Sequence, residues 1–207
     1  MTTFSECFNV ILTGDREASR KAARQVRKLV YSSAGDGREK FEEMAAIIEN
    51  APKEYEKIKE ESRQENFVMA ISVMYFLHNK ESQPDFLFPW LFDLIQHTNG
   101  YIRYAAVRMF ENELGPLTVH LRCPNDSSFR HRADQSNTIL CELYFHLMEL
   151  ATKLWKPIYK RYKYISSLPN GSYKSMQMVL GTMGEYCGED YMSRGFEEQG
   201  YPRPPKK

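Results

Sequence analysis

The sequence predicts an all-α protein, and three observations lead to this class. Strand signals are nearly absent, because the Asp36-Gly37 and Asn99-Gly100 pairs, which often turn β-hairpins, each lie between helical patterns. Apolar residues instead recur at three- and four-residue spacing along most of the chain. Turn and capping residues separate these stretches. We therefore expect about eight helices with short connections and no sheet.

The first quarter of the chain is expected to hold three helices. Residues 4–12 read as a short helix, and Asp15 is expected to be the N-cap of a second helix that runs to Tyr31. Asp36 is expected to cap the third, and Pro52 to interrupt it. The buried stripe of this third helix is expected to be Phe41, Met44, Ala45 and Ile48.

Later elements follow the same pattern. Helices are expected over 67–77, 85–97 and 101–114, the last of them closed by Gly115-Pro116. Ser136 or Asn137 is expected to cap a long helix over 138–165, bent at Pro157, and a last helix is expected over 173–186.

A chain of 207 residues with 42% hydrophobic and 27% charged residues is long enough for one sizeable helical domain, which we place at 1–200. Within it we expect repeats over 1–115, a loop over 117–136 and irregular C-terminal helices over 137–200. The proline-rich end, 201–207, is expected to be a flexible tail.

Several function classes are disfavoured by composition. The start lacks a basic segment before an apolar run, and the longest apolar-rich run, 86–95, is too short to span a bilayer. The four cysteines are widely separated and form no CxxC pair, which indicates reduced thiols. We expect a cytoplasmic protein without membrane contact.

Residues 97–110, HTNGYIRYAAVRMF, form the most informative local pattern. A turn on Asn99-Gly100 precedes an apolar residue, an arginine and the small pair Ala105-Ala106. This pattern resembles the second-helix signature of the HEAT-like (armadillo-type) α-helical repeat superfamily. The resemblance implies an α-α superhelix and places Arg103 near the turn between helices. It also implies a core position for Ile102, Ala105, Ala106 and Met109 or Phe110.

A weaker echo of this pattern lies 34 residues earlier, in the segment from Phe67, and another lies a further 49 residues before that, in the segment from Asp15. These offsets are irregular, and no echo follows Leu117. An irregular helical bundle with ordinary small-residue contacts is the alternative architecture.

Two cationic stretches are the candidate binding surface. On the expected second helix, four arginines follow i, i+4, i+8 and i+11 spacing: Arg16, Arg20, Arg24 and Arg27. In KLWKPIYKRYKYISS, residues 153–167, helical spacing would align Lys153, Lys156, Lys160 and Lys163 beside Trp155, Tyr159 and Tyr162. Lysine rows neutralise phosphates and aromatic rings stack on bases. A solvated cationic face with packed aromatics is the simpler interpretation.

No catalytic or metal constellation is specific. Glu142, His146 and Glu149 share a helical face, but they lack the paired histidines of HExxH, so an ordinary Glu-His pair is favoured. Cys141 with His146, or Cys187 with His120, would have to meet in space to act as nucleophile and base. We assign no catalytic residue, no metal and no cofactor.

These observations favour a non-catalytic helical-repeat scaffold that binds another protein or a second copy of itself. The net charge of +1 names no partner, but charge is segregated: residues 15–32 hold six bases and two acids, and residues 36–65 hold ten acids and six bases. The alternative is a nucleic-acid-binding HEAT-like protein that uses its basic faces. DNA glycosylases of the AlkD type share that superfamily, but the catalytic aspartate that the resemblance demands has no clear position here.

Overall fold

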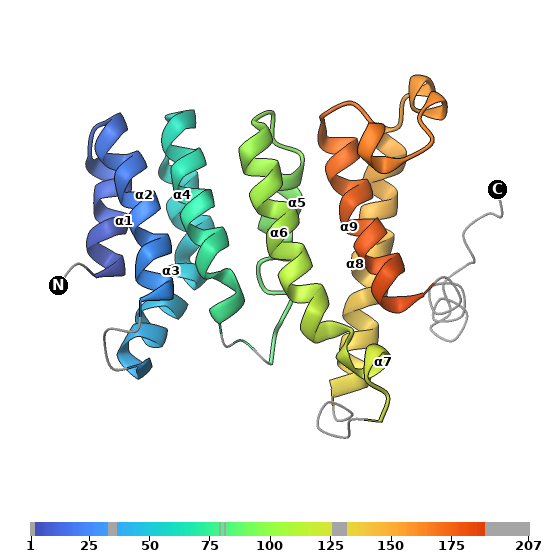
Figure 1. Cartoon of the computed structure of the whole chain (residues 1–207), viewed down its shortest axis with the longest axis horizontal. Coiled ribbons are helices and arrows are strands. Elements are labelled where there is room, and N and C mark those ends of the chain that lie inside the picture. The colour runs from blue at the N-terminus through green and yellow to red at the C-terminus, as the bar shows by residue number, and fades with distance from the viewer. Residues whose placement is uncertain (1–2, 33–36, 79, 81, 126–131, 189–207) are drawn as a thin grey trace. The chain divides into compact units, whose positions relative to one another are not determined.

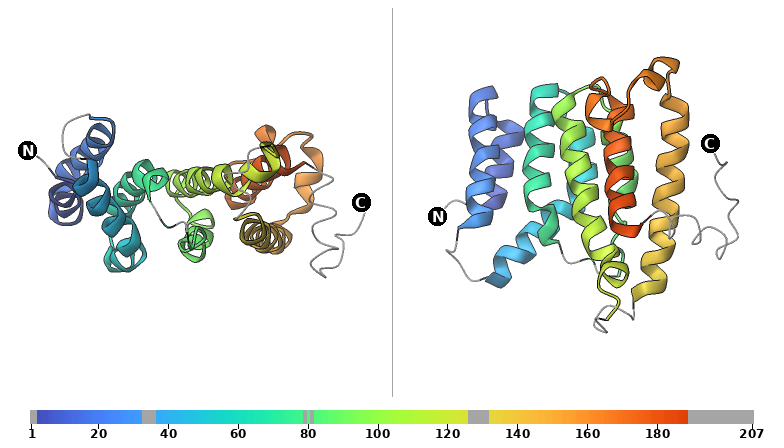
Figure 2. Two further views of the ribbon diagram at one scale, coloured as in Figure 1. Left: turned by 90° about the horizontal axis from the view of Figure 1, so that it is seen from below. Right: turned by 45° about the vertical axis from the view of Figure 1, so that its right-hand side comes forward.

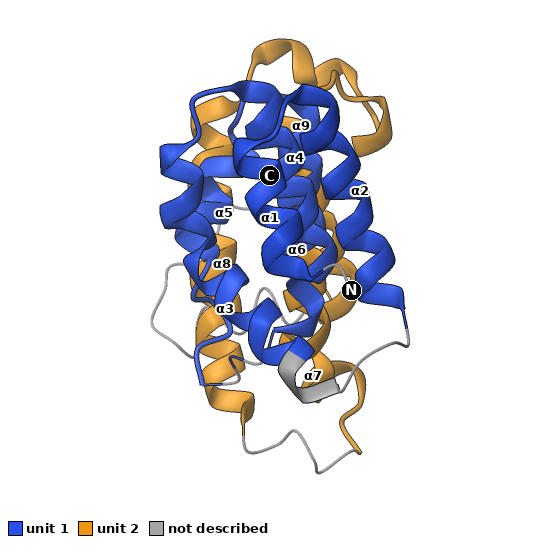
Figure 3. Ribbon diagram, turned by 90° about the vertical axis from the view of Figure 1, so that its left-hand side faces the viewer, with its two compact units in different colours: residues 1–109 blue, residues 110–207 orange. Residues whose placement is uncertain are grey.

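The structure is a computed structural model that describes residues 3–32, 37–78, 80, 82–125 and 132–188. These residues form nine α-helices and no strand, so the all-α prediction is confirmed (Figure 1). The chain divides into two compact units, residues 1–109 and 110–207, which Figure 3 shows in different colours. Each unit is described by itself.

Unit 1 is built from helices that alternate between two layers. Helices α1 and α3 contact each other, α2 contacts α4, and α1–α2 and α3–α4 pack as pairs (Figure 2). Its elements are α1 (Phe4–Thr13), α2 (Arg16–Tyr31), α3 (Gly37–Lys57), α4 (Glu61–Met74), the 3₁₀ turn η1 (Tyr75–Leu77), α5 (Phe88–Ile95) and the first half of α6 (Gly100–Leu117).

The first two helices begin at side-chain caps. The Thr3 hydroxyl accepts a hydrogen bond from the Glu6 amide (3.1 Å), and the Glu6 carboxylate accepts one from the Thr3 amide (3.0 Å). The Asp15 carboxylate accepts a hydrogen bond from the Ala18 amide (2.8 Å), so the predicted cap is confirmed. Each cap satisfies amides that the first helical turn leaves without a partner.

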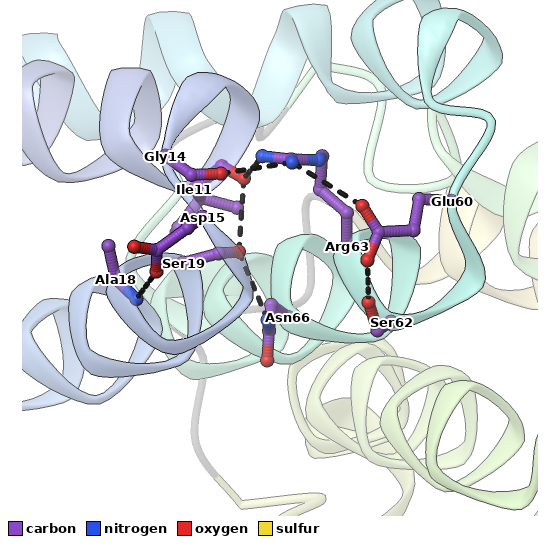
Figure 4. A network of polar contacts seen from close by, with 9 residues as sticks. All are labelled: Ile11, Gly14, Asp15, Ala18, Ser19, Glu60, Ser62, Arg63 and Asn66. Carbon is purple, nitrogen blue, oxygen red and sulfur yellow. Dashed lines mark hydrogen bonds and ion pairs between the residues drawn. The ribbon is translucent and has the colours of Figure 1, made fainter.

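A network of polar contacts joins α4 to the α1–α2 turn (Figure 4). The Arg63 guanidinium donates hydrogen bonds to the carbonyl oxygens of Ile11 (2.8 Å) and Gly14 (3.0 Å). The Ser19 hydroxyl also donates to the Ile11 carbonyl (3.0 Å), and it accepts from the Asn66 amide (3.0 Å). These bonds satisfy carbonyl groups at the end of α1 and fix α2 against α4.

The turn before α6 has its own polar contacts. The Asn99 side chain accepts from the Tyr101 amide (2.8 Å) and donates to the Glu65 carboxylate (3.0 Å). Arg103 donates to the carbonyl oxygens of His97 and Thr98, both at 2.7 Å, and burial lowers the pKa of its guanidinium. Arg103 therefore lies at the inter-helix turn, as expected, and the expected core positions are all buried: Ile102, Ala105, Ala106, Met109 and Phe110.

Unit 2 is organised around its last helix. Helix α9 (Ser172–Cys187) contacts α7, α8 and the turn η4. The other elements are the second half of α6, α7 (Val119–Arg122), α8 (Ala133–Leu154) and the 3₁₀ turns η3 (Pro157–Arg161) and η4 (Ile165–Ser167). Arg122 links α7 to α6 and α9, because it donates to the Gly115 carbonyl (2.7 Å) and its guanidinium lies 4.8 Å from the ring centre of Tyr186.

Two predicted interruptions in the first two thirds of the chain are wrong. Pro52 lies inside α3, and Gly115-Pro116 lies inside α6, which continues to Leu117. Ala51 is buried next to Pro52, and Leu117 and Thr118 are buried just after Pro116. The packing of these neighbours stabilises the helix and offsets the hydrogen bond that each proline cannot donate. Phe41 is exposed although it was expected in the core, and the expected cap Asp36 lies outside the described residues.

The prediction of one long helix over 138–165 is also wrong. Helix α8 begins earlier, at Ala133, and ends at Leu154, and Lys156 is extended with φ −120° and ψ 142°. A residue before proline is pushed out of the α region by the proline ring, so Pro157 ends the helix and starts η3. The expected loop over 117–136 likewise contains the short helix α7.

Candidate functional site: an aromatic and lysine-rich hollow

The candidate site lies in unit 2, along the segment 155–171 that connects α8 to α9. The segment and the first half of α9 surround an open hollow of about 550 Å³. Its lining is defined by these ten residues: Trp155, Tyr159, Lys160, Tyr162, Lys163, Tyr164, Ile165, Leu168, Tyr173 and Gln177. Five of them are aromatic and two are lysines. The volume lies within the usual range of ligand pockets.

Contacts with α9 hold this segment in place. The rings of Tyr159 and Tyr173 stack with centres 4.6 Å apart and planes inclined by 14°. The Lys174 ammonium donates to the Ser166 carbonyl (3.3 Å). Gly181 allows Ile165 to approach α9, since a Cβ atom at this glycine would lie 3.3 Å from the Ile165 Cδ1 atom.

Two lysines of the hollow lie over aromatic rings. The Lys160 ammonium is 5.5 Å from the ring centre of Trp155, and the Lys163 ammonium is 5.3 Å from that of Tyr164. Both rings are solvent-accessible, with Trp155 39% and Tyr164 62% exposed. Each pair therefore presents a cation beside a flat apolar face.

No carboxylate neutralises these cations from within the segment. Residues 153–167 contain five basic and no acidic residues. Lys153 pairs with Glu149 on α8 (2.8 Å). Among the described residues, no ion pair includes Lys156, Lys160, Arg161 or Lys163. The hollow is consequently suited to an anionic ligand.

The contact of each lysine with its ring is weak enough for a planar ligand to compete with it. A cation–π contact at an exposed site contributes about 0.5–1 kcal/mol. Stacking of a nucleobase on an aromatic side chain contributes about 1–3 kcal/mol. Stacking of a planar group on either ring is therefore at least comparable in strength to the present contact of that ring with an ammonium group.

The structure brings together five of the predicted site residues in this hollow: Trp155, Tyr159, Lys160, Tyr162 and Lys163. It does so without the predicted helical stripe, because only Lys153 belongs to α8. Lys153 and Lys156 are exposed but do not line the hollow. Sequence reasoning left out the contributions of Tyr164, Tyr173 and Gln177, and the i, i+4 spacing of the last two on α9 was the available signal.

The predicted arginine row lies on α2, in unit 1. Arg16, Arg20, Arg24 and Arg27 are all exposed, while Ala22 and Val26 on the opposite face are buried. The row is therefore one solvent-facing stripe, as its spacing predicted. The row therefore belongs to unit 1 and the hollow to unit 2.

The other candidate chemistry finds little support in the local geometry. Glu142, His146 and Glu149 are exposed on α8, and the Lys153 ammonium lowers the pKa of the Glu149 carboxyl. Within the part of the chain that the structure describes, no three His, Cys, Asp or Glu side chains are grouped to hold a metal ion.

Cys141 and Cys187, the two candidate nucleophiles, have thiols of low reactivity. Burial raises the pKa of the Cys187 thiol to about 11, with a further rise from Cys141 and a smaller opposing effect of Arg122. Burial also raises the pKa of Cys141. Because the thiolate is the reactive form, neither residue is activated near neutral pH. His120 is engaged with Asn137 (2.8 Å).

Comparisons with protein-family models, with curated proteins and with solved structures gave no match to this chain. No helix in the described ranges is both long and apolar enough to cross a membrane.

Proposed function

We propose that this protein is a non-catalytic helical-repeat scaffold that binds an anionic macromolecular partner in the aromatic and lysine-rich hollow. One observation carries the proposal: five aromatic rings and two lysines line an open hollow in a segment that contains no acidic residue. Tryptophan and tyrosine are enriched among the residues that dominate the binding energy of protein interfaces.

The HEAT-like architecture is part of this proposal. Three features of unit 1 support it: the paired helices α1–α2 and α3–α4, the buried alanine pair of α6, and the arginine that bonds the turn before α6. Repeat scaffolds of this type bind partners on exposed helix faces and connecting turns. Architecture alone does not define a function, so the binding site carries the argument.

Two partner classes fit an anionic ligand. An acidic protein segment, including the acid-rich residues 36–65 of a second copy, is supported by exposed apolar side chains. Five of the eleven large apolar residues that are exposed in the described chain lie within 155–165. Nucleic acid is supported by the exposed rings and by lysines outside any described ion pair. A cytoplasmic location remains the prediction made from the separated cysteines.

The proposal is tested by titrating the full chain with two labelled polyanions, oligothymidylate and polyglutamate, and following fluorescence anisotropy. We expect at least one to bind, with affinity that falls between about 50 and 200 mM salt. Lys160→Gln with Lys163→Gln should weaken this binding.

The matched control is Arg24→Gln with Arg27→Gln, which removes two exposed cations from unit 1 and should leave binding at the hollow unchanged. Absence of binding to both polyanions at low salt would contradict the proposal.

A further inference from the structure

We propose that the aromatic and lysine-rich hollow binds single-stranded nucleic acid, with bases stacked on its rings and phosphates beside its lysines. This inference rests on the proposed function and names the ligand class of the same site. The ligand class is inferred from three properties of the hollow: the composition of its lining, the placement of its charges and the exposure of its ring faces.

The lining favours planar ligands over an ordinary peptide. A groove for an amphipathic helix presents a mainly aliphatic surface to the apolar face of its partner. Here half of the lining residues are aromatic, and only Ile165 and Leu168 are aliphatic. Flat, delocalised rings are the usual platforms for unpaired bases, because every base has a π-face that can stack.

The placement of charge matches a base that is linked to a phosphate. Each of the two cation–π pairs sets one ammonium group between 5.3 and 5.5 Å from a ring centre. When a base occupies the ring face, the ammonium moves to its edge, where the sugar-phosphate backbone continues. The same pairing occurs twice within ten residues, at Trp155–Lys160 and Lys163–Tyr164, which suits successive nucleotides of one strand.

The site requires bases that are not already paired. In a duplex, both faces of each base are stacked on neighbouring base pairs, so protein rings reach them only after the helix is opened. The exposed rings of Trp155 and Tyr164 therefore select a single strand, whereas lysines alone would bind a duplex equally well.

The chain provides its own reporter for the test. It contains two tryptophans, of which Trp90 is buried in unit 1 and Trp155 lies in the hollow. In a Trp90→Phe variant, all tryptophan fluorescence comes from the hollow. A thymidine oligomer of about a dozen nucleotides should quench this fluorescence and saturate.

Variants separate stacking from charge. Tyr164→Ala should weaken binding of the oligomer by at least about fivefold, as expected for the loss of one stacked base. Lys160→Gln with Lys163→Gln should reduce the slope of log affinity against log salt by about 1.4, since each phosphate contact of a single strand contributes about 0.7. The matched control is Tyr101→Ala in α6, a tyrosine of nearly equal exposure (64% against 62%), which should not change the affinity.

Three results would overturn the inference. They are equal affinity for a duplex of the same length, unchanged affinity of Tyr164→Ala, and binding of polyglutamate without binding of the oligomer. The third result would leave the proposed function standing and assign the site to an acidic protein partner. Failure of both polyanions to bind would overturn the proposed function as well.

Discussion

Arg63 shows how one side chain can stabilise the join between two helix pairs. It donates to two carbonyl oxygens at the end of α1, and its side chain is only 19% exposed. Hydrogen bonds that involve a charged group contribute about 1.5–3 kcal/mol each. We therefore expect Arg63→Ala to lower the free energy of unfolding of unit 1 by about 2–3 kcal/mol. Urea unfolding followed by Trp90 fluorescence, in a Trp155→Phe background, measures this effect.

Two further substitutions control for charge and for arginine loss in general. Arg63→Lys keeps the charge but loses the planar fork that reaches two acceptors, so it should recover only part of the stability. Arg20→Ala removes an exposed arginine of α2 and should change the stability by less than about 0.5 kcal/mol. A change of that small size for Arg63→Ala would show that solvent replaces both bonds.

Cys187 predicts a loss of stability in alkaline solution. Its ordinary pKa of 9.0 applies to the unfolded chain, whereas burial raises the pKa in the folded state to about 11. Between these values the folded state keeps a proton that the unfolded state has released, so the free energy of unfolding falls as pH rises. The contribution of the thiol is fully present below pH 9 and is lost as pH approaches about 11.

The measurement is the urea midpoint between about pH 8 and pH 11 for the parent and for Cys187→Ala. The variant should show a shallower fall. Cys7 and Cys141 also have raised pKa values, so some slope should remain in the variant. Identical slopes in the two proteins would mean that Cys187 ionises equally in both states.

At the scale of elements, helix existence was predictable and helix ends were less so. Helices α1, α2 and α9 agree with the predicted ranges to within one residue, because capping residues and apolar spacing mark both ends locally. Prolines were misread in both directions. Pro52 and Pro116 lie within helices, while Pro157 ends one. The difference depends on burial of neighbouring residues, which local sequence does not display.

The candidate site was predictable in composition but not in geometry. The cationic and aromatic character of residues 153–167 is visible in the sequence, and five of the predicted residues line the hollow. A helical template assigned the lysines to one stripe and the aromatics to an adjacent stripe. The segment after α8 instead consists of two 3₁₀ turns and their connections, and it places Lys160 over the Trp155 ring and Lys163 over the Tyr164 ring. Tyr173 completes the site through a contact that only tertiary structure creates.

Two glycines of α9 offer a matched test of how the segment is held. A Cβ atom at Gly181 would lie 3.3 Å from Ile165, whereas one at Gly184 would meet nothing within 4 Å. Gly184→Ala should stabilise unit 2 by about 0.5–1 kcal/mol, because alanine restricts the unfolded chain and favours the helix. Gly181→Leu should displace η4 from α9 and destabilise unit 2 by about 1–3 kcal/mol.

Thermal unfolding, followed by Trp155 fluorescence in the Trp90→Phe background, compares these two variants. Gly181→Leu should also weaken oligothymidylate binding, because Ile165 lines the hollow. Equal stability of the parent and Gly181→Leu would show that η4 does not depend on close contact with α9.

At the scale of the whole molecule, each unit contains a buried core and one tryptophan. Trp90 reports on unit 1 and Trp155 on unit 2. Among the described residues, the indole nitrogen of Trp90 has no hydrogen-bond acceptor, so Trp90→Phe removes no hydrogen bond of that nitrogen. The two single-tryptophan proteins therefore follow the unfolding of the two units separately.

Helix α6 belongs to both units, since residues 100–109 fall in unit 1 and residues 110–117 in unit 2. A helix that two units share couples their unfolding only through its own backbone hydrogen bonds. Each core, in contrast, stabilises its own unit through many contacts. We therefore expect Arg63→Ala to shift the transition seen by Trp90 more than that seen by Trp155, and Gly181→Leu to do the reverse. Equal shifts of both transitions for each variant would show a single cooperative domain over residues 1–200, because a two-state chain loses all its structure at one midpoint.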